Sequence, residues 1–442
     1  MKRFFLWFSL TILVLLVAAL LGFRYWFLSY LRSEPCRLLA SEAASRALGA
    51  QAAFTLFQAD SLDSVYADSF SARNGPGYRL IQADQLRADV RFGFLSRRCT
   101  VESLEIARLR LIAGDPAAPA SQPPMPAPAK ANAPSSGAFS LDRVEVRLLE
   151  MGWNGGTVTG SSLVATPSPE GEWLAEGQGG TFRPSLGPEW KLDTFRGRQR
   201  RDGFHLTEAK LRSGEKGTAR VEGVFGEDAQ CRATFEGVAL SALLPEDWRA
   251  RIVGALGGEL KFVGKGSGMT LSEGRLTITD GEVVTLPIFD LVARLTRIDG
   301  FRKMRLHKAQ ARVVQSDGVL EVRDFVVEST GLLRLEGSFT IRDGEISGTL
   351  QAGVSESALQ WIPGARETLF TTSRDGYVWT PVKLSGLAAH PQEDFTARLA
   401  ALAVSGAAGA AGEVLDATVD KVQDGTKKVI DLFSPLLPSP VR

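Results

Sequence analysis

Apolar and polar residues alternate with a period of two along much of the chain, most clearly between residues 333 and 354. A β-strand whose side chains point alternately to its two faces gives this pattern when one face is apolar and the other is wet. Asp343-Gly344 supplies a tight hairpin turn, and the pattern resumes after it. The apolar positions are Leu333, Leu335, Phe339, Ile341, Ile346, Leu350 and Val354, alternating with polar residues such as Arg334, Glu336, Thr340, Glu345 and Gln351.

Further strands with this pattern are predicted throughout the segment 137–401, at residues 144–148, 204–211, 219–225, 231–235, 260–263 and 276–279. Leu260, Phe262, Leu276 and Ile278 are apolar positions of the last two strands. Asp-Gly pairs at 202–203, 280–281, 317–318 and 375–376 are each expected to close a turn. Their irregular spacing indicates a loose series of hairpins, without a repeat of fixed length.

Three short helices interrupt the predicted strands. Residues 35–49 read as a helix with Leu38, Leu39, Ala43 and Leu48 on its apolar positions and Gly49 as its stop. Residues 240–256 and 286–298 also have helical spacing, and the second has a proline near its start.

The N-terminus carries an uncharged apolar stretch, residues 4–23. A helix of that length covers the ~30 Å hydrocarbon core of a bilayer. Lys2 and Arg3 precede the stretch, which favours a cytoplasmic N-terminus and places the rest of the chain across the membrane. The alternative is a cleaved secretory signal, but its apolar region would be only ~7–15 residues long. We favour a retained anchor, represented by Phe4, Leu13, Leu20, Phe23 and the interfacial Trp26.

Composition changes twice more along the chain. Residues 115–136 are rich in proline and alanine, so a flexible spacer is expected. A Gly/Ala-rich hinge at 405–412 leads to a predicted amphipathic helix that could lie on a membrane, contact a partner or, as we favour, cap the sheet.

The predicted parts are 1–34 (cytoplasmic tip and anchor), 35–114 (α/β subdomain), 115–136 (linker), 137–401 (β body) and 402–442 (hinge and helix).

The overall charge and the cysteine count narrow the function classes. Of 442 residues 44% are hydrophobic and 23% charged, with a net charge of +1, so no nucleic-acid partner is expected. Three cysteines are too few for a disulfide scaffold. Cys36 and Cys99 flank one small subdomain and could pair in an oxidising compartment; separate buried thiols fit equally well.

No catalytic, cofactor-binding or metal-binding motif stands out. The three histidines, His205, His307 and His390, lie far apart, no HExxH or GxSxG sequence is present, and no Gly-rich phosphate loop follows a strand. Charged residues fall mainly on the wet positions of the strands. We therefore expect neither an enzyme nor a cofactor.

The amount of one-sided apolar strand surface is what needs an explanation. A second sheet, helices or a ligand can cover such a face. The sequence is consistent with a closed sandwich or with a long curved, largely antiparallel sheet whose hollow binds acyl chains. In the second case the lining candidates are Leu260, Phe262, Leu276, Ile278, Leu333, Leu335, Phe339, Ile341, Ile346, Leu350 and Val354.

The order of segments resembles the AsmA-like family of cell-envelope proteins. The resemblance rests at the front on the anchor, Ala47-Leu48-Gly49 and SLEIARLRL at 103–111. The C-terminal half carries GRLTITDG (274–281), VVTLPIFDLVARL (283–295), DGVLEVRDFVVES (317–329), LRLEGSFTIRDGEISGTL (333–350), IPGA (362–365) and TPVKLSGLAAHP (380–391). The proline-rich linker and the added C-terminal helix depart from the family pattern.

The resemblance implies a mainly β, groove-shaped periplasmic protein, related to TamB and bridge-like lipid-transfer proteins. It implies lipid transport or outer-membrane biogenesis, with membrane lipids, the inner membrane and other envelope proteins as partners, and no catalytic residues. About twenty to twenty-five strands ~4.8 Å apart give a part-length conduit at most. The competing interpretation is a scaffold or assembly factor that does not bind lipid and whose sheet edges receive strands from other proteins.

Overall fold

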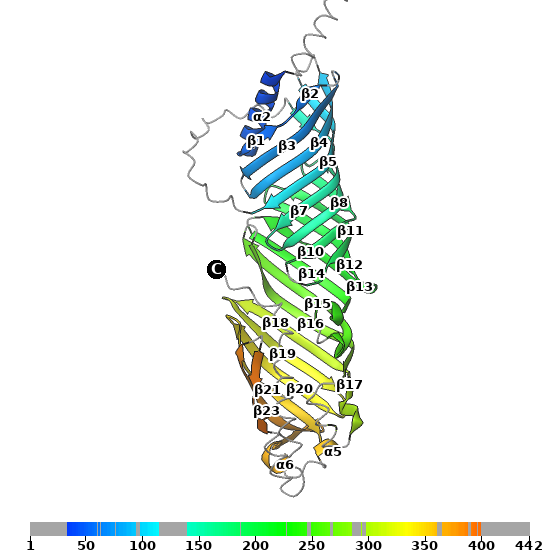
Figure 1. Ribbon diagram of the computed structural model, residues 1–442, viewed down its shortest axis with the longest axis vertical. Helices are drawn as coiled ribbons and strands as arrows, with labels where there is room; N and C mark the ends of the chain where they lie inside the picture. Colours follow the sequence, from blue (N-terminus) through cyan, green and yellow to red (C-terminus); the bar gives the residue numbers. More distant parts are fainter. Residues whose placement is uncertain are drawn as a thin grey trace, which may run out of the picture. The chain divides into compact units, whose positions relative to one another are not determined.

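The computed structural model describes residues 33–398, apart from 60, 62, 76, 94–97, 115–138, 186, 227, 245–248, 266–267, 285–292, 294–297, 360–364, 388–389 and 396. This part of the chain is mainly β structure with a few short helices, as the sequence predicts (Figure 1). It divides into two compact units. Unit 1 comprises Met1–Phe182 with Leu192–Thr207, and unit 2 comprises Arg183–Lys191 with Glu208–Arg442.

Among its described residues, unit 1 contains helix α2 and a sheet in which consecutive strands are mostly antiparallel neighbours. Strand β3 has β1 and β2 on one side and β4 on the other, and the sheet continues through β5, β7, β8, β9 and β11. The elements are α2 (Glu34–Leu48), β1 (Gln51–Phe54), β2 (Phe57–Ala59), β3 (Ser64–Gly75), β4 (Tyr78–Gly93), β5 (Arg98–Ala113), β6 (Phe139–Leu141), β7 (Val144–Trp153), β8 (Gly156–Pro167), β9 (Trp173–Gln178), β10 (Thr181–Pro184), β11 (Trp190–Arg200) and the start of β12 (Gly203–Ser213).

Strands β5 and β7 are parallel, and β6 also pairs with β5 in parallel. Parallel neighbours need a crossover of a dozen or more residues, which the proline- and alanine-rich segment is long enough to supply. The strands before and after this segment therefore belong to one sheet. This differs from the sequence-based division, which separates 35–114 from 137–401 at this linker. The two compact units instead separate between residues 182 and 208.

The described pairings of unit 2 are all antiparallel. The sheet runs from β13 through β14, β15, β16, β18, β19, β20, β21 and β23 to β24, with β17 beside β16 and β22 beside β23. The elements are β13 (Gly217–Gly226), β14 (Asp228–Ala239), η1 (Leu240–Ala242), β15 (Ile252–Lys265), β16 (Gly268–Val284), η2 (Asp299–Phe301), β17 (Lys303–Leu306), β18 (Lys308–Ser316), β19 (Val319–Ser329), β20 (Leu333–Arg342), β21 (Glu345–Ser355), α5 (Glu356–Leu359), α6 (Ala365–Thr368), β22 (Thr372–Arg374), β23 (Tyr377–Leu387) and β24 (His390–Glu393).

Three predicted Asp-Gly hairpin turns are confirmed in unit 2. At Asp343-Gly344 the φ angles are 50° and 80°, and the pairs at 317–318 and 375–376 have the same two positive signs. Two successive positive φ angles define the type I′ turn, whose twist matches that of the flanking strands. Asp-Gly fits because aspartate tolerates the left-handed conformation and glycine adopts it freely.

The Asp280-Gly281 turn predicted from the sequence is wrong. Strand β16 continues through both residues, and its register with β15 shifts between Val253 and Ala255. Asp280 has a φ of 50° at this shift, so the pair forms a β-bulge. A left-handed aspartate serves a bulge as well as a turn, which is why local sequence does not separate the two.

The predicted helices have different outcomes. Helix α2 confirms the first, and Gly49 ends it in the left-handed conformation with a φ of 60°. The helix predicted at 240–256 is wrong at its C-terminal end, because residues 252–256 belong to β15; Leu240–Ala242 form a 3₁₀ turn, and 245–248 lie outside the described residues. The prediction at 286–298 falls almost entirely outside the described residues.

The predicted membrane anchor, with Phe4, Leu13, Leu20, Phe23 and Trp26, lies outside the described residues, as does the C-terminal segment 402–442. Within the described part of the chain, no helix has the length and apolar character needed to cross a bilayer.

Candidate functional site

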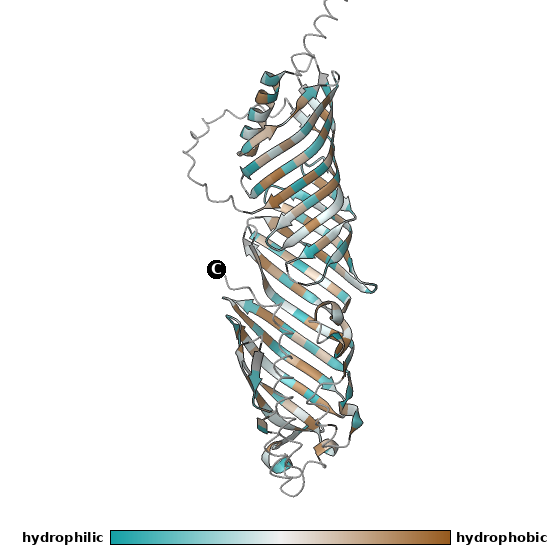
Figure 2. Ribbon diagram, in the orientation of Figure 1, coloured by the Kyte–Doolittle hydropathy of each residue, from teal (hydrophilic) through white to brown (hydrophobic). Residues whose placement is uncertain are grey.

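The strand register of unit 2 places all eleven predicted apolar positions on one face of the sheet, which we call the apolar face. Residues directly opposite each other in an antiparallel pair point to the same side. Figure 2 shows the resulting alternation of hydrophobic and hydrophilic residues along these strands. Opposite pairs on the apolar face are Leu256 with Ile278, Ala233 with Leu260, Phe262 with Leu271, Leu276 with Ala311, Val322 with Phe339, Ile341 with Ile346, Leu335 with Ala352, Leu333 with Val354, and Leu350 with Val382.

Exposure divides the apolar face into two sections. In the buried section, on β19 to β23, Phe339 is only 4% exposed and Ile341 only 3%. Ile346, Leu350 and Val354 are buried as well. In the half-exposed section, on β14 to β16, most large apolar side chains keep part of their surface accessible, whereas Val238 of β14 and Val283 of β16 are buried. This section comprises Cys231, Phe235, Leu256, Leu260, Phe262, Leu271, Leu276 and Ile278.

A cluster of side chains from outside the main strands covers one end of the buried section. Phe301 and Met304 come from the segment around η2 and β17, and Leu359 and Phe370 come from the region of α5 and α6. They pack against Val354 and neighbouring side chains of the sheet. The buried candidates Phe339, Ile341, Ile346, Leu350 and Val354 therefore belong to the protein's own core. Here the structure differs from the expectation that they line an open surface.

The half-exposed section is continuous with that core. Leu260, Leu271, Leu276 and Leu335 are partly buried and pack against the cluster that contains Phe339. Leu256 and Ile278 pack instead beneath Leu240 and Leu244, which follow β14. Phe235, Leu256 and Leu271 were not among the predicted candidates. Alternation within β14 and β15 was the available signal for the first two, but the bulge opposite Lys261 and Phe262 hides the phase of Leu271.

The opposite face of the same strands is charged and ion-paired. Glu273 of β16 accepts hydrogen bonds from Arg312 at 2.7 Å and from Lys261 at 3.4 Å. These bonds hold the pKa of the Glu273 carboxyl below its usual value. Arg232 likewise bridges Glu222 and Glu259 on the two neighbouring strands. Cross-strand pairs of opposite charge suit a wet surface, on which Val253 and Val263 of β15 are the exposed apolar side chains.

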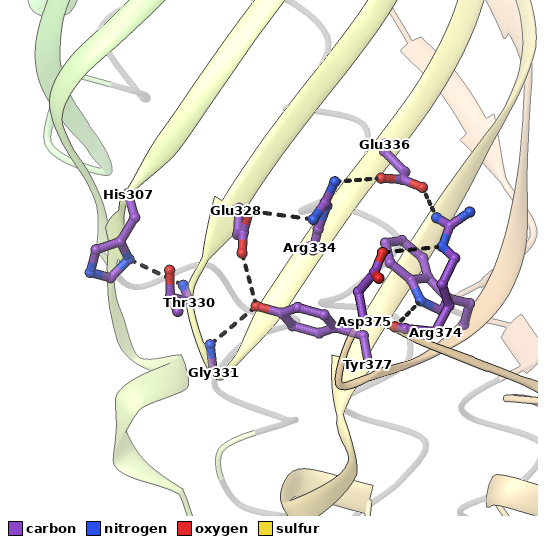
Figure 3. A network of polar contacts seen from close by, with 10 residues as sticks. His307, Glu328, Thr330, Gly331, Arg334, Glu336, Arg374, Asp375 and Tyr377 are labelled. Atoms are coloured by element: carbon purple, nitrogen blue, oxygen red, sulfur yellow. Dashed lines mark hydrogen bonds and ion pairs between the residues drawn. The ribbon is translucent and has the colours of Figure 1, made fainter.

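A denser polar network lies near the end of β19 and the start of β20 (Figure 3). The guanidinium of Arg334 contacts Glu336 at 3.0 Å and Glu328 at 3.7 Å, and Arg374 contacts the other oxygen of Glu336. The Tyr377 hydroxyl donates to Glu328 at 3.2 Å, and burial raises its pKa. Both arginines also lie over the ring of the buried Trp379, at 5.9 Å and 4.7 Å. Every strong charge here has an opposite partner, so the network holds the strands together.

The cysteines and histidines are dispersed in the structure. Cys36 carries a free thiol on α2, whereas the side chain of Cys99 on β5 is outside the described part, so their disulfide stays a prediction. His205 contacts Asp202 at 2.9 Å, and His307 accepts a hydrogen bond from the Thr330 backbone N–H at 3.1 Å. Among the described residues, no three metal-ligating side chains gather in one place.

Comparison with protein-family models, with curated proteins and with solved structures found no match in any of the three.

Proposed function

We propose that the half-exposed section of the apolar face binds the acyl chains of membrane lipids. The observation that carries the proposal is the contrast between the two faces of β14 to β16. One face shows a contiguous set of partly accessible leucines, phenylalanines and an isoleucine, while the other is ion-paired and wet. Contiguous accessible apolar surface on a folded protein marks a binding site for an apolar partner.

The dimensions of this section suit a hydrocarbon chain. Leu271 and Ile278 lie seven residues apart on β16, which corresponds to roughly 23 Å along the strand. One leaflet of a bilayer core is about 15 Å thick, half of the ~30 Å total. The section is therefore long enough for an extended acyl chain. Apolar contact has no direction, so we expect the site to accept many lipid classes.

The sequence adds a setting for this site. With residues 4–23 as a single-pass anchor in the inner membrane and the N-terminus in the cytoplasm, the body lies in the periplasm. The resemblance to AsmA-like proteins supports a role in lipid transport or outer-membrane assembly. In this setting the protein acts as a part-length conduit that works with other envelope proteins.

Neighbouring residues on β15 and β16 point to opposite faces, which provides a sharp test in the full-length protein. Leu276 and Phe262 lie on the apolar face, and Thr277 and Lys261 are their wet neighbours. Each position is replaced in turn by the photo-cross-linking residue p-benzoylphenylalanine, in cells whose phospholipids carry ³²P. After irradiation we expect labelled protein from positions 276 and 262 and little label from 277 and 261.

Equal labelling on both faces, or no label at 276 and 262, would overturn acyl-chain binding. A cross-link from position 276 to another protein, without phospholipid, would also overturn it, and would show that a partner covers the apolar face.

A further inference from the structure

Helix α2 seals the outer edge of strand β1 with polar side chains. In β1 the backbone N–H and C=O groups of Ala52 and Phe54 point away from β3. The Ser45 hydroxyl lies 2.9 Å from the Ala52 nitrogen and 3.0 Å from its carbonyl oxygen. The Ser41 hydroxyl accepts from the Phe54 N–H at 3.1 Å, and Arg37 donates to the Phe54 carbonyl. A free strand edge is thereby satisfied without another strand.

This edge contact fixes the rotation of the helix, and the result is the reverse of an ordinary surface helix. Ser41 is the buried residue of α2, at 8% exposure, whereas Leu38 and Leu39 are each 54% exposed. Pro35 and Ala43 are exposed at the matching helical spacing. An amphipathic helix normally turns its leucines to the core, so an outward pair of adjacent leucines marks a candidate contact surface.

The position of α2 in the chain indicates which partner this is. The helix begins at Glu34, and the predicted anchor ends at Phe23. Even fully extended, the fifteen residues from Phe23 to Leu38 span at most about 50 Å. The sequence between them, RYWFLSYLR at 24–32, is rich in the aromatic residues that favour a membrane interface. With that anchor in the membrane, Leu38 and Leu39 are held within reach of the bilayer surface.

We propose that α2 lies on the outer surface of the membrane that holds the anchor, with Leu38 and Leu39 inserted at the boundary between headgroups and acyl chains. The proposal depends on the anchoring part of the proposed function and is independent of acyl-chain binding by unit 2. The attraction is apolar. Arg37 is paired with Glu34 and Arg46 with Glu42, which leaves little net charge on the helix for anionic headgroups.

The test uses the full-length protein, with its three native cysteines replaced by serine, in vesicles of phosphatidylethanolamine and phosphatidylglycerol. A single cysteine is introduced by Leu39→Cys and labelled with the environment-sensitive fluorophore NBD. Leu387→Cys is the matched control, because Leu387 is an equally exposed leucine, at 55%, on β23 of unit 2. Lipids brominated on their acyl chains quench a fluorophore that reaches the apolar boundary.

We expect strong quenching at position 39, little at 387, and no loss of quenching when salt is added, because screening acts only on charges. Equal quenching at both positions, none at 39, or failure of the full chain to enter vesicles would overturn the proposal. Since the readout is at α2, quenching at 39 without lipid cross-links at Leu276 would leave this proposal standing while the acyl-chain site fails.

Discussion

Phe339 of β20 lies directly over Gly348, its opposite residue on β21. A Cβ added to Gly348 would stand 2.5 Å from the Phe339 Cβ, closer than real Cβ atoms approach. The glycine therefore makes room for the aromatic side chain within the buried section of the apolar face. Gly353 accommodates the Trp379 ring from β23 in the same way on the other side of the sheet.

The first prediction concerns this contact. Gly348→Ala should lower the free energy of unfolding by about 1–3 kcal/mol, because the new methyl overpacks a closed part of the core. The shift is measured as the urea midpoint followed by tryptophan fluorescence. Gly257→Ala is the control, since a Cβ there would meet its nearest neighbour at an ordinary 3.4 Å. A stability loss as large for Gly257 as for Gly348 would contradict the packing argument.

The second prediction concerns the network of Figure 3. Glu336 binds both Arg334 and Arg374, and its side chain is only 20% exposed. Glu336→Gln should cost about 1–3 kcal/mol of unfolding free energy, because two half-buried guanidinium groups lose their charged acceptor. Urea unfolding provides the measurement.

Glu321→Gln is the matched control for Glu336, because Glu321 pairs with Arg323 on an open surface of β19. An exposed pair contributes little to stability, so this variant should unfold close to the unaltered protein. If both variants lost the same free energy of unfolding, the network would contribute no more to stability than an exposed ion pair.

The third prediction concerns Cys231, in the half-exposed section. Burial, with a smaller effect from Glu222, raises the pKa of its thiol to about 11. The ordinary thiol pKa is 9.0, so well below both values Cys231 holds roughly 100-fold less thiolate. The greater nucleophilicity of that thiolate offsets part of the deficit, leaving alkylation roughly 10–30-fold slower.

Alkylation of Cys231 is followed by peptide mass spectrometry after timed exposure to iodoacetamide. The rate should keep rising with pH beyond 9, whereas the same cysteine in the urea-unfolded chain should level off near its ordinary pKa. A plateau at the same pH in the folded and unfolded protein would show that Cys231 is not held among apolar side chains.

The fourth prediction concerns the seal between α2 and β1. Ser45→Ala leaves the Ala52 N–H without its side-chain acceptor, which costs about 1–3 kcal/mol for a buried backbone group. Hydrogen exchange at Ala52 should accelerate accordingly. Ala43→Ser, on the exposed side of the same helix, is the control and should leave exchange at Ala52 unchanged. Unchanged exchange in Ser45→Ala would mean that the serine does not protect the edge.

The sequence predicted which residues share a face but could not predict what covers that face. Alternation placed Phe339 and Leu276 on the same side because the period of a strand is local. Phe339 is buried in a cluster with side chains of neighbouring strands and with Phe395, a residue that no periodicity connects to β20.

The sequence predicted helix α2 but did not predict which side of the helix is buried. Leucine spacing favours burial of Leu38 and Leu39, and the hydrogen bonds from Ser41 and Ser45 to another element turn them outward. Local pattern also gave the wrong element at 252–256, because those residues follow a short 3₁₀ turn and pair with β16. In each case a non-local partner overrides local periodicity.

The parallel pairing of β5 with β7 has a consequence for the integrity of unit 1. From Leu104 opposite Val144 to Ile112 opposite Gly152, the two strands are joined by ladder hydrogen bonds as well as by the chain. Cleavage anywhere between residues 115 and 138 would thus yield two polypeptides that remain one particle. The same break point would allow the protein to be produced from two separate genes whose products reassemble.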